Sequence, residues 1–498
     1  MCAIIALHGL IAPISLLKNR GFRAKKARPD TSGIQEGIAA ISTDRSNARA
    51  GAAYSWYAIG LLTIIYTLNF LDRQVVNILA ESIKDDLKLQ DWQIGVLTGL
   101  SFALVYAVAS IPAARLADHS NRSTLLSGAL ALWSGFTALC AVASGFWHLA
   151  LFRLGVGVGE SACTPAAHSL IIDLAPRERR ATAMAVYQLG APFGVLLGMV
   201  LGGLVADRFG WRAAFLIAGA PGLAIALMAL LSLREPRART PKTMPRAGTF
   251  VRDMKSLLGR KAFVLFALGG GLITLRAYGT QAFVASFFFR VHAAGLKELS
   301  ATLAHSYGIH LGPVGIVGTF LGIVGGIASL IGTMAGGLLA DRAARHDPRH
   351  YATVAAIPQI LQVPFYVAGL LTPDLITSML LLSVPAAFNS ASLGPYWTTI
   401  QALATPSTRA TAAASALIAT TVIGLGFGPL LVGILSDTLA ASGMSAGTGL
   451  RWSLIAAEMP ALLAAALLWM SRPGLAAGLW RHDEEPPLTN KGAERRIA

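Results

Sequence analysis

The sequence is poor in charge for a chain of its length. Asp, Glu, Lys and Arg together make up 13% of its 498 residues, whereas a soluble globular protein has about 25%. Charge at this level cannot cover a water-facing surface of this size, while a surface that faces lipid needs no such cover. Hydrophobic residues make up 54% of the chain. The composition therefore predicts an integral membrane protein.

The sequence also lacks the patterns of metal sites and disulfides. Its three cysteines, Cys2, Cys140 and Cys163, form no CxxC pair, and no HExxH sequence is present. A glycine-rich run at Gly155–Gly159 lies inside an apolar stretch and follows no strand, which excludes a nucleotide fingerprint there. We therefore expect no catalytic residue, no metal and no cofactor. A transporter is favoured over the other class considered, a membrane-embedded enzyme or sensor.

Long apolar runs are present instead. A membrane-spanning helix needs about 20 predominantly apolar residues, and twelve such stretches predict an all-α membrane protein built as two six-helix bundles. The stretches lie at approximately 55–80, 92–114, 123–144, 147–173, 181–206, 211–233, 261–288, 313–340, 351–371, 374–403, 410–436 and 449–471.

These spans divide the chain into five predicted segments. The segments are an N-terminal tail (1–52), a first bundle (53–233), a basic linker (234–260), a second bundle (261–472) and a C-terminal tail (473–498). The apolar stretch Met1–Leu17 precedes the basic residues of its tail, which is the wrong order for a signal peptide. An interfacial helix and residues upstream of the true start are the two interpretations of this stretch.

The basic residues show how the spans are oriented. The net charge of +16 could suggest a nucleic-acid partner, but the distribution of Lys and Arg explains it through topology. With the N-terminus inside, 31 of the 41 basic residues lie on inner segments and 7 on outer loops. The positive-inside rule then predicts a cell inner membrane protein with both termini, and the linker, in the cytoplasm. No nucleic-acid partner is expected.

A repeated ending marks four of the predicted spans. A small residue followed four positions later by aspartate closes spans 2, 5, 8 and 11, and two of these aspartates fall on each side of the membrane. The four endings are Ala114–Asp118, Gly203–Asp207, Gly337–Asp341 and Gly433–Asp437. This pattern predicts inverted three-helix repeats nested within the two halves.

The loops at Asp118 and Asp341 resemble the loop signature of the major facilitator superfamily. Three further segments, Asn69–Arg73, Phe152–Glu160 and Gly210–Arg212, resemble the spinster-like family within it. The resemblance covers roughly residues 55–470. It implies the superfamily fold of two six-helix bundles and a spinster-like transporter of lysophospholipids or sphingolipids.

The resemblance also implies a gate at the cytoplasmic loops. Asp118, Arg122, Asp341 and Arg342 occupy its positions, and Asp118 lies at a helix end, where it can pair with a cation or a helix N-terminus. Such contacts would tie the halves together in the outward-facing state. Ordinary anchoring of the loops is the alternative.

Ionisable residues inside spans are costly and usually face a cavity or one another. Arg153 and Glu160 are two helical turns apart, about 10 Å along the axis and on one face, and Asp72 is the candidate intermediate partner. A buried carboxylate beside an arginine can exchange protons as an anion arrives. The resemblance implies that Asp72, Arg153 and Glu160 couple transport to protons. A structural ion-pair cluster is the alternative.

Several further residues are candidates for substrate contact. Arg73 points to a different helix face from Asp72, and Arg276, beside Tyr278, is a cation at membrane depth that would suit an anionic headgroup. Pairing with Glu458 is the alternative for Arg276. Phe283 could line an apolar cavity for an acyl chain, or pack in the core. The substrate-binding candidates are Arg73, Arg153, Arg276, Tyr278 and Phe283.

The sequence thus favours a secondary active transporter that couples to protons and works by alternating access. The spinster-like resemblance implies an anionic amphipathic substrate, such as a lysophospholipid or sphingoid phosphate. The expected partners are this substrate or another organic anion, protons and membrane lipids, and the expected state is a monomer. A passive lipid facilitator and a transporter of drugs or small organic anions are the alternatives.

Overall fold

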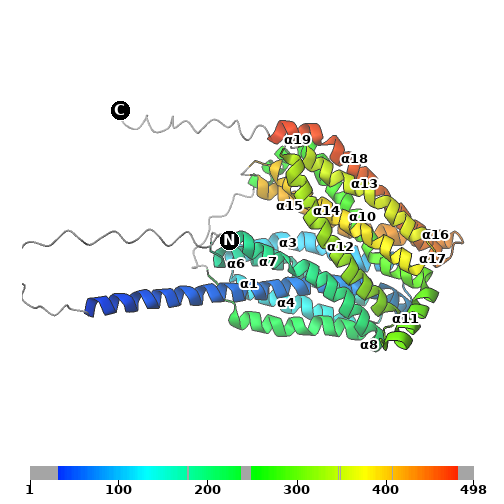
Figure 1. The fold of residues 1–498 in the computed structure, drawn as a ribbon, viewed down its shortest axis with the longest axis horizontal. Helices are drawn as coiled ribbons and strands as arrows, with labels where there is room; N and C mark the ends of the chain where they lie inside the picture. The colour runs from blue at the N-terminus through cyan, green and yellow to red at the C-terminus, as the bar shows by residue number, and fades with distance from the viewer. Residues whose placement is uncertain are drawn as a thin grey trace, which may run out of the picture. The chain divides into compact units, whose positions relative to one another are not determined.

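The computed structural model describes residues 32–176, 179–236, 248–345, 347, 349–405 and 408–479; over 32–52 and at a few other positions, Asp118 among them, it describes the backbone alone. The chain forms two compact units, Met1–Tyr54 and Ser55–Ala498. In the first unit, residues 32–54 are helical and begin helix α1 (Ser32–Leu87). Every regular element among the described residues is a helix (Figure 1).

The first six predicted spans are present as helices, which we call the N half. They are α1, α2–η1–α3 (Asp91–Gly95, Val96–Leu100, Ser101–His119), α4–η2 (Arg122–Leu139, Cys140–Val142), α5–α6 (Phe146–Ser161, Cys163–Leu174), α7 (Arg180–Gln188) and α8 (Gly190–Ser232). The fifth and sixth spans run together as α8, which turns at Gly210, where a backbone φ of 79° favours glycine. This turn matches the predicted start of the sixth span.

The last six predicted spans are present as well, and we call them the C half. They are α10 (Lys261–Val291), α12 (Pro313–Ala344), α13 (His350–Leu371), α14 (Leu375–Ala402), α15–η4–α16 (Arg409–Ala419, Thr420–Phe427, Gly428–Ala441) and α17–α18 (Ala446–Ala456, Met459–Met470). Three further helices flank or join these spans: α9 (Gly248–Leu258), α11 (Ala293–Tyr307) and α19 (Arg472–Leu479).

Ten helices among the described residues are long and apolar enough to cross a membrane. Two local features explain why ten such helices correspond to twelve predicted spans. The kinked α8 carries two spans as one helix, and the fourth span is divided at Ala162 into the shorter helices α5 and α6. The predicted twelve-helix, all-α fold is confirmed.

Glycines let helix backbones approach closely within and between the halves. A Cβ atom added at Gly194 of α8 would lie 2.3 Å from the Thr67 carbonyl oxygen of α1, and one added at Gly318 of α12 would lie 2.3 Å from the Met199 carbonyl oxygen of α8. Gly326 of α12 has no such neighbour, because nothing lies within 4 Å of a Cβ atom added there. The pair α8 and α12 forms one side of the contact between the halves (Figure 1).

The bundle has two ends that differ in their contacts. We call the end where α8 stops and α10 starts the linker end, and the opposite end the far end. At the linker end, α9 is amphipathic and buries Leu257 in the hydrophobic core of the C half, against residues such as Phe263 and Phe266. The short helix α9 is therefore part of the C half rather than a free connector.

Candidate functional site

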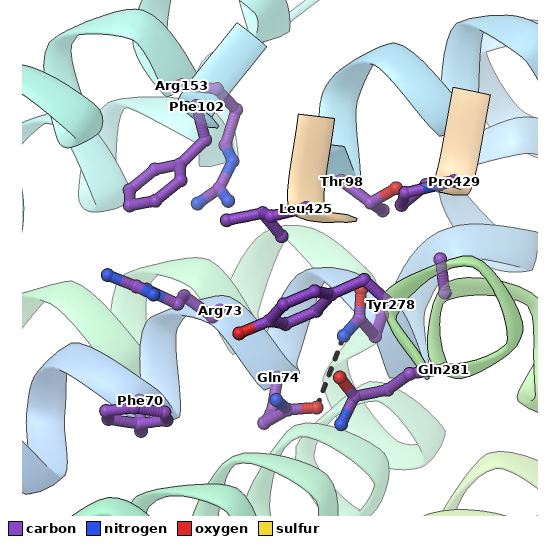
Figure 2. Close-up of a pocket in the computed structure, with 12 residues that line it drawn as sticks. Phe70, Arg73, Gln74, Thr98, Phe102, Arg153, Tyr278, Gln281, Leu425 and Pro429 are labelled. Carbon is purple, nitrogen blue, oxygen red and sulfur yellow. Dashed lines mark hydrogen bonds between the residues drawn. The ribbon is translucent and has the colours of Figure 1, made fainter. Parts of the chain in front are cut away.

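A small cavity lies between the two halves near the middle of the spans. Its volume is about 30 Å³, which is roughly the space of one water molecule. Side chains from α1, η1, α3 and α5 face it from the N half, and side chains from α10, η4 and α16 face it from the C half (Figure 2). Two arginines, Arg73 and Arg153, line this cavity. The site thus offers positive charge to a small polar or anionic group.

Arg73 is paired with the buried carboxylate of Glu160. Its Nε and Nη2 atoms donate to Glu160 Oε2 at 2.9 and 2.6 Å. The guanidinium also lies over the ring of Phe102, 4.4 Å from the centroid, where a cation is attracted to the aromatic face. The side chain of Arg73 keeps 19% exposure, while that of Glu160 has none. A ligand in the cavity can therefore reach the arginine but not the carboxylate behind it.

Asp72 points away from Arg73, into the N half. Its Oδ2 accepts a hydrogen bond of 3.1 Å from the Thr137 hydroxyl of α4. Neither Asp72 Oδ1 nor Glu160 Oε1 has a hydrogen-bond partner among the described residues. The predicted arrangement, with Asp72 between Arg153 and Glu160, differs from the structure, where Arg73 rather than Asp72 contacts Glu160. Asp72 remains in the electrostatic neighbourhood of both residues.

Arg153 is the second cation of the cavity and lies on the same face of α5 as Glu160. It is buried, and its Nε donates to the carbonyl oxygen of Leu97 at 3.3 Å. Among the described residues no carboxylate lies within ion-pair distance of Arg153. A buried guanidinium held by one carbonyl is available to an anion that enters the cavity.

The C-half wall of the cavity is uncharged. Tyr278 and Gln281 of α10 and Leu425 of η4 line it. The hydroxyl end of Tyr278 points toward Arg73 (Figure 2). On the N-half side, Asn77 donates to the Gln74 side chain at 3.2 Å. The charges of the cavity thus come from the N half alone.

At the far end, one arginine ties the two halves together. Arg290, in the last turn of α10, donates to both oxygens of Glu81 at 2.7 and 2.8 Å, and to both oxygens of Asp91 at 2.8 and 2.7 Å. Lys84 and Ser436 also contact the Asp91 carboxylate, each at 2.6 Å. Charge-assisted bonds in paired, planar geometry are among the strong polar contacts of proteins.

Two aspartates reinforce this closure by capping helices of the opposite half. Asp207 of α8 accepts from the backbone N–H groups of Val314 and Gly315 at the start of α12, at 3.2 and 2.7 Å. Asp437 of α16 accepts from the N–H groups of Asp91 and Trp92 at the start of α2, at 3.1 and 2.8 Å. A helix N-terminus has free N–H donors and favours negative charge. The same contact therefore occurs once on each side of the far end.

A sequence model described as Major Facilitator Superfamily matches residues 62–369. The chain belongs to the Major Facilitator Superfamily. Spinster proteins are among its relatives and among the solved structures similar to it, which makes it a spinster-like transporter within that superfamily.

The relatives of this superfamily member carry names that describe different functions. It is 34% identical over 448 residues to an "MFS-type efflux pump" of Mycolicibacterium smegmatis, which covers 89% of this chain and 97% of that protein. It is 26% identical over 395 residues to the "Sphingosine-1-phosphate transporter SPNS2" of Danio rerio, covering 77% of each. It is 25% identical over 423 residues to "Protein spinster homolog 1" of Homo sapiens, covering 82% of this chain and 76% of that protein.

A solved structure also resembles this superfamily member closely. A bacterial homologue of the human lysosomal transporter spinster, in an "Inward-facing And Unoccupied Conformation", superposes with a TM-score of 0.73 at 29% sequence identity. The match covers 85% of this chain and 98% of that one.

Two of the predicted substrate contacts of the transporter lie away from the cavity. Arg276 of α10 is buried and donates through Nε to Glu458 Oε1 at 2.7 Å, and its guanidinium lies 5.2 Å from the ring centroid of Tyr366. Phe283 has no exposed surface and packs in the core. In this conformation both residues follow the alternative interpretation, internal pairing for Arg276 and core packing for Phe283, while Arg73, Arg153 and Tyr278 line the cavity.

The predicted gate residues lie at the linker end. Arg122 is buried and donates to Asp173 of α6 at 2.6 Å, and its backbone N–H donates to Glu235 after α8 at 2.7 Å. These contacts stay within the N half and its outgoing segment. Asp341 and Arg342 are exposed. The side chain of Asp118 lies outside the described residues, so the gate it was expected to form stays a prediction.

The far-end contacts of the transporter do not follow from the sequence. Arg290 is one of the seven basic residues on the predicted outer loops, and no local pattern indicates that Glu81 and Asp91 are its partners. A signal did exist for Asp207 and Asp437, because both end the repeated small-x-x-x-Asp pattern. Asp207 and Asp437 lie at predicted helix ends, as Asp118 does, so each could be expected to pair with a helix N-terminus.

Proposed function

We propose that this chain is a proton-coupled secondary active transporter that carries an anionic amphipathic substrate, of the lysophospholipid or sphingoid-phosphate type, by alternating access. The observation that carries the proposal is the Arg73–Glu160 pair at the wall of the cavity between the halves. A charged pair at membrane depth beside a cavity is costly and usually functional. The spinster-like relatives support the substrate class.

Coupling follows from competition for the Glu160 carboxylate. Arg73 holds Oε2 of Glu160, and Oε1 has no hydrogen-bond partner among the described residues. Protonation at Oε1 removes the negative charge that holds Arg73, which frees its guanidinium for an anionic group in the cavity. Arg153 supplies the second cation for that group. Asp72, with one unpartnered oxygen, is a further proton acceptor in the same half. Anion binding and proton binding are thereby linked.

The far-end contacts support alternating access. Every ion pair and side-chain hydrogen bond that joins the halves between described residues lies at the far end. Rocking of the two bundles about a midplane site requires such contacts to form in one state and break in the other. We place the protein in the cell inner membrane as a monomer, with both termini cytoplasmic. The far end is then periplasmic, and the conformation faces inward.

The test is transport by purified protein in proteoliposomes under an imposed pH gradient, with a labelled lysophospholipid as substrate. We expect accumulation that requires the gradient. Glu160→Gln should abolish accumulation but preserve exchange of labelled for unlabelled substrate, because exchange needs no net proton movement. Arg153→Ala should weaken both. Accumulation by Glu160→Gln equal to that of the unsubstituted protein would overturn the coupling proposal and favour a passive facilitator.

A second candidate function is efflux of drugs or small organic anions. Two observations favour it: the similarity to the Mycolicibacterium smegmatis efflux pump and the small volume of the charged cavity. The same proteoliposomes distinguish the two candidates. Gradient-dependent flux of a small aromatic anion that lysophospholipid does not inhibit would favour the efflux candidate.

A further inference from the structure

A second cavity lies on the C half toward the linker end. It is an open groove of about 380 Å³ between α9, α10 and the α15–η4 segment, a volume within the roughly 300–1,000 Å³ of small-molecule sites. Its lining is apolar except for Ser415. Three lining residues, Leu258, Leu268 and Ile418, keep between 38% and 56% exposure. The groove is therefore accessible from outside the core.

The groove offers a ligand no free hydrogen-bonding group. The Ser415 hydroxyl donates to the Thr411 carbonyl oxygen at 2.6 Å and contacts the sulfur of Met254 at 3.1 Å. A polar ligand would lose its hydration without replacement partners. An apolar chain loses nothing and gains burial. A water molecule occupies about 30 Å³, and a methylene group occupies slightly less. The groove therefore has room for roughly a dozen methylene groups.

The groove and the charged cavity lie along the same two segments. Leu425 of η4 lines the charged cavity, and Ile423, two residues away, lines the groove. On α10 the ten residues from Tyr278 to Leu268 separate them by about 15 Å along the axis. A ligand with its anionic end at Arg73 and Arg153 and its apolar part in this groove would have to span this distance of about 15 Å.

We propose that the groove binds the single apolar chain of the transported amphiphile and that α9 sets the length of chain it accepts. The proposal rests on the proposed function and extends it to the substrate's apolar part. Helix α9 is anchored by Leu257 in the C-half core, and it presents Met254 and Leu258 to the groove. The groove has room for one chain, so single-chain lipids are preferred over two-chain lipids. The apolar site lies here rather than at Phe283.

The experiment measures binding of saturated lysophosphatidylglycerols, from octanoyl to stearoyl, to the purified full-length protein by scintillation proximity. We expect Kd to fall about two- to fourfold per added methylene until the groove is full, and then to level off. Ala267→Phe, which fills the groove, should make Kd stop falling at a shorter chain length, while octanoyl binding persists. Leu258→Ala should make Kd stop falling at a longer chain length. Ala466→Phe, at an exposed position of α18, should reproduce the unsubstituted curve.

Three outcomes would overturn the groove proposal. In the first, the levelling point is the same in all variants. In the second, diacyl phosphatidylglycerol competes as well as the single-chain lipid. In the third, native mass spectrometry finds a phospholipid that leaves with Ala267→Phe while lysolipid binding stays unchanged, which would make the groove a site for a resident lipid. Transport of the same series under a pH gradient tests the proposed function separately. If binding depends on chain length but the pH gradient drives no transport, the coupling proposal is refuted and the groove proposal stands. If the gradient drives transport but binding does not depend on chain length, the groove proposal is refuted and the coupling proposal stands.

Discussion

Arg290 and Asp91 form a two-pronged ion pair across the halves of the molecule, with Nη1 2.8 Å from Oδ2 and Nη2 2.7 Å from Oδ1. The same guanidinium holds Glu81. Because Arg290 belongs to the C half and both carboxylates to the N half, the energy of these bonds is available only while the far end is closed. The pair therefore acts on the equilibrium between conformations.

Arg290→Ala should open the far end. Loss of one partner of a buried ion pair costs about 3–5 kcal/mol, which shifts a conformational ratio more than about 100-fold. We would measure it by the spin-label distance between Phe209→Cys and Tyr307→Cys, both exposed on opposite halves, in a Cys2→Ser background. The distance distribution should gain a longer component.

Arg212→Ala is the matched control for Arg290→Ala. Arg212 pairs with Asp86 at 2.6 Å, also at the far end, but both residues lie in the N half and both are exposed. This variant should leave the distance distribution unchanged, because an exposed pair contributes little and this one does not bridge the halves. Equal distance distributions for Arg290→Ala and the unsubstituted protein would refute the proposal that Arg290 holds the far end closed.

Asp207→Ala and Asp437→Ala should each weaken far-end closure, since each removes the acceptor for two backbone N–H groups of the opposite half. A lost helix cap costs about 1 kcal/mol. The two sites lie on separate helix pairs, so their effects on the spin-label distance ratio should add. A double variant no more open than either single variant would contradict independent caps.

Asp374→Ala is the control for these caps. Asp374 accepts from the Thr377 N–H at 2.7 Å within the C half, so its loss should lower stability without changing the distance ratio. This bond lowers the pKa of Asp374. Its folded-state pKa lies below the unfolded value, so its contribution is present above the unfolded pKa and is lost as pH falls through the folded pKa. Asp374→Ala should therefore lose less stability in acid than at neutral pH, as thermal unfolding in detergent would show.

Arg276 should prove structural rather than ligand-binding. Arg276→Met leaves the buried Glu458 carboxylate without its cation, which should cost about 3–5 kcal/mol, whereas the double variant Arg276→Met with Glu458→Gln should recover much of that loss. The measurements are thermal unfolding and substrate KM. If the double variant regains stability but its KM rises tenfold, Arg276 contacts substrate in another conformation.

Gly194→Ala should destabilise the N half. The added Cβ would lie 2.3 Å from the Thr67 carbonyl oxygen, a backbone atom of α1 that cannot move alone, and overpacking of this kind costs about 1–3 kcal/mol. Gly325→Ala is the control, because nothing lies within 4 Å of its added Cβ and alanine favours a helix by about 1 kcal/mol over glycine. Thermal unfolding should move in opposite directions, and equal shifts would contradict the packing argument.

The elements of this fold could be predicted because each depends on a short stretch of sequence. A run of about 20 apolar residues spans a membrane whatever its neighbours are, and Gly210 allows the turn between the fifth and sixth spans without help from elsewhere. The repeated small-x-x-x-Asp endings are also local patterns and can be read from the sequence. For the same reason, Arg153 and Glu160 could be placed on one face of one helix.

The partners of the charged residues could not be predicted in this way. The hydrophobic pattern of a membrane helix shows that it is buried in lipid or protein, but not which helix lies beside it. The sequence interpretation therefore placed Asp72 beside Glu160, where the structure has Arg73. It left Arg276 and Phe283 as possible ligand contacts, although both lie in the interior of the C half.

The membrane location, the helical spans, the two-half repeat and the presence of charge at membrane depth follow from the chain's residues alone, because apolar length and residue spacing decide these locally. That Arg73 holds Glu160, that Arg290 joins the halves and that α9 lines the apolar groove emerges only from the folded structure. Each of these contacts brings together residues far apart in the chain, and helix packing alone selects which of the many possible pairs meet.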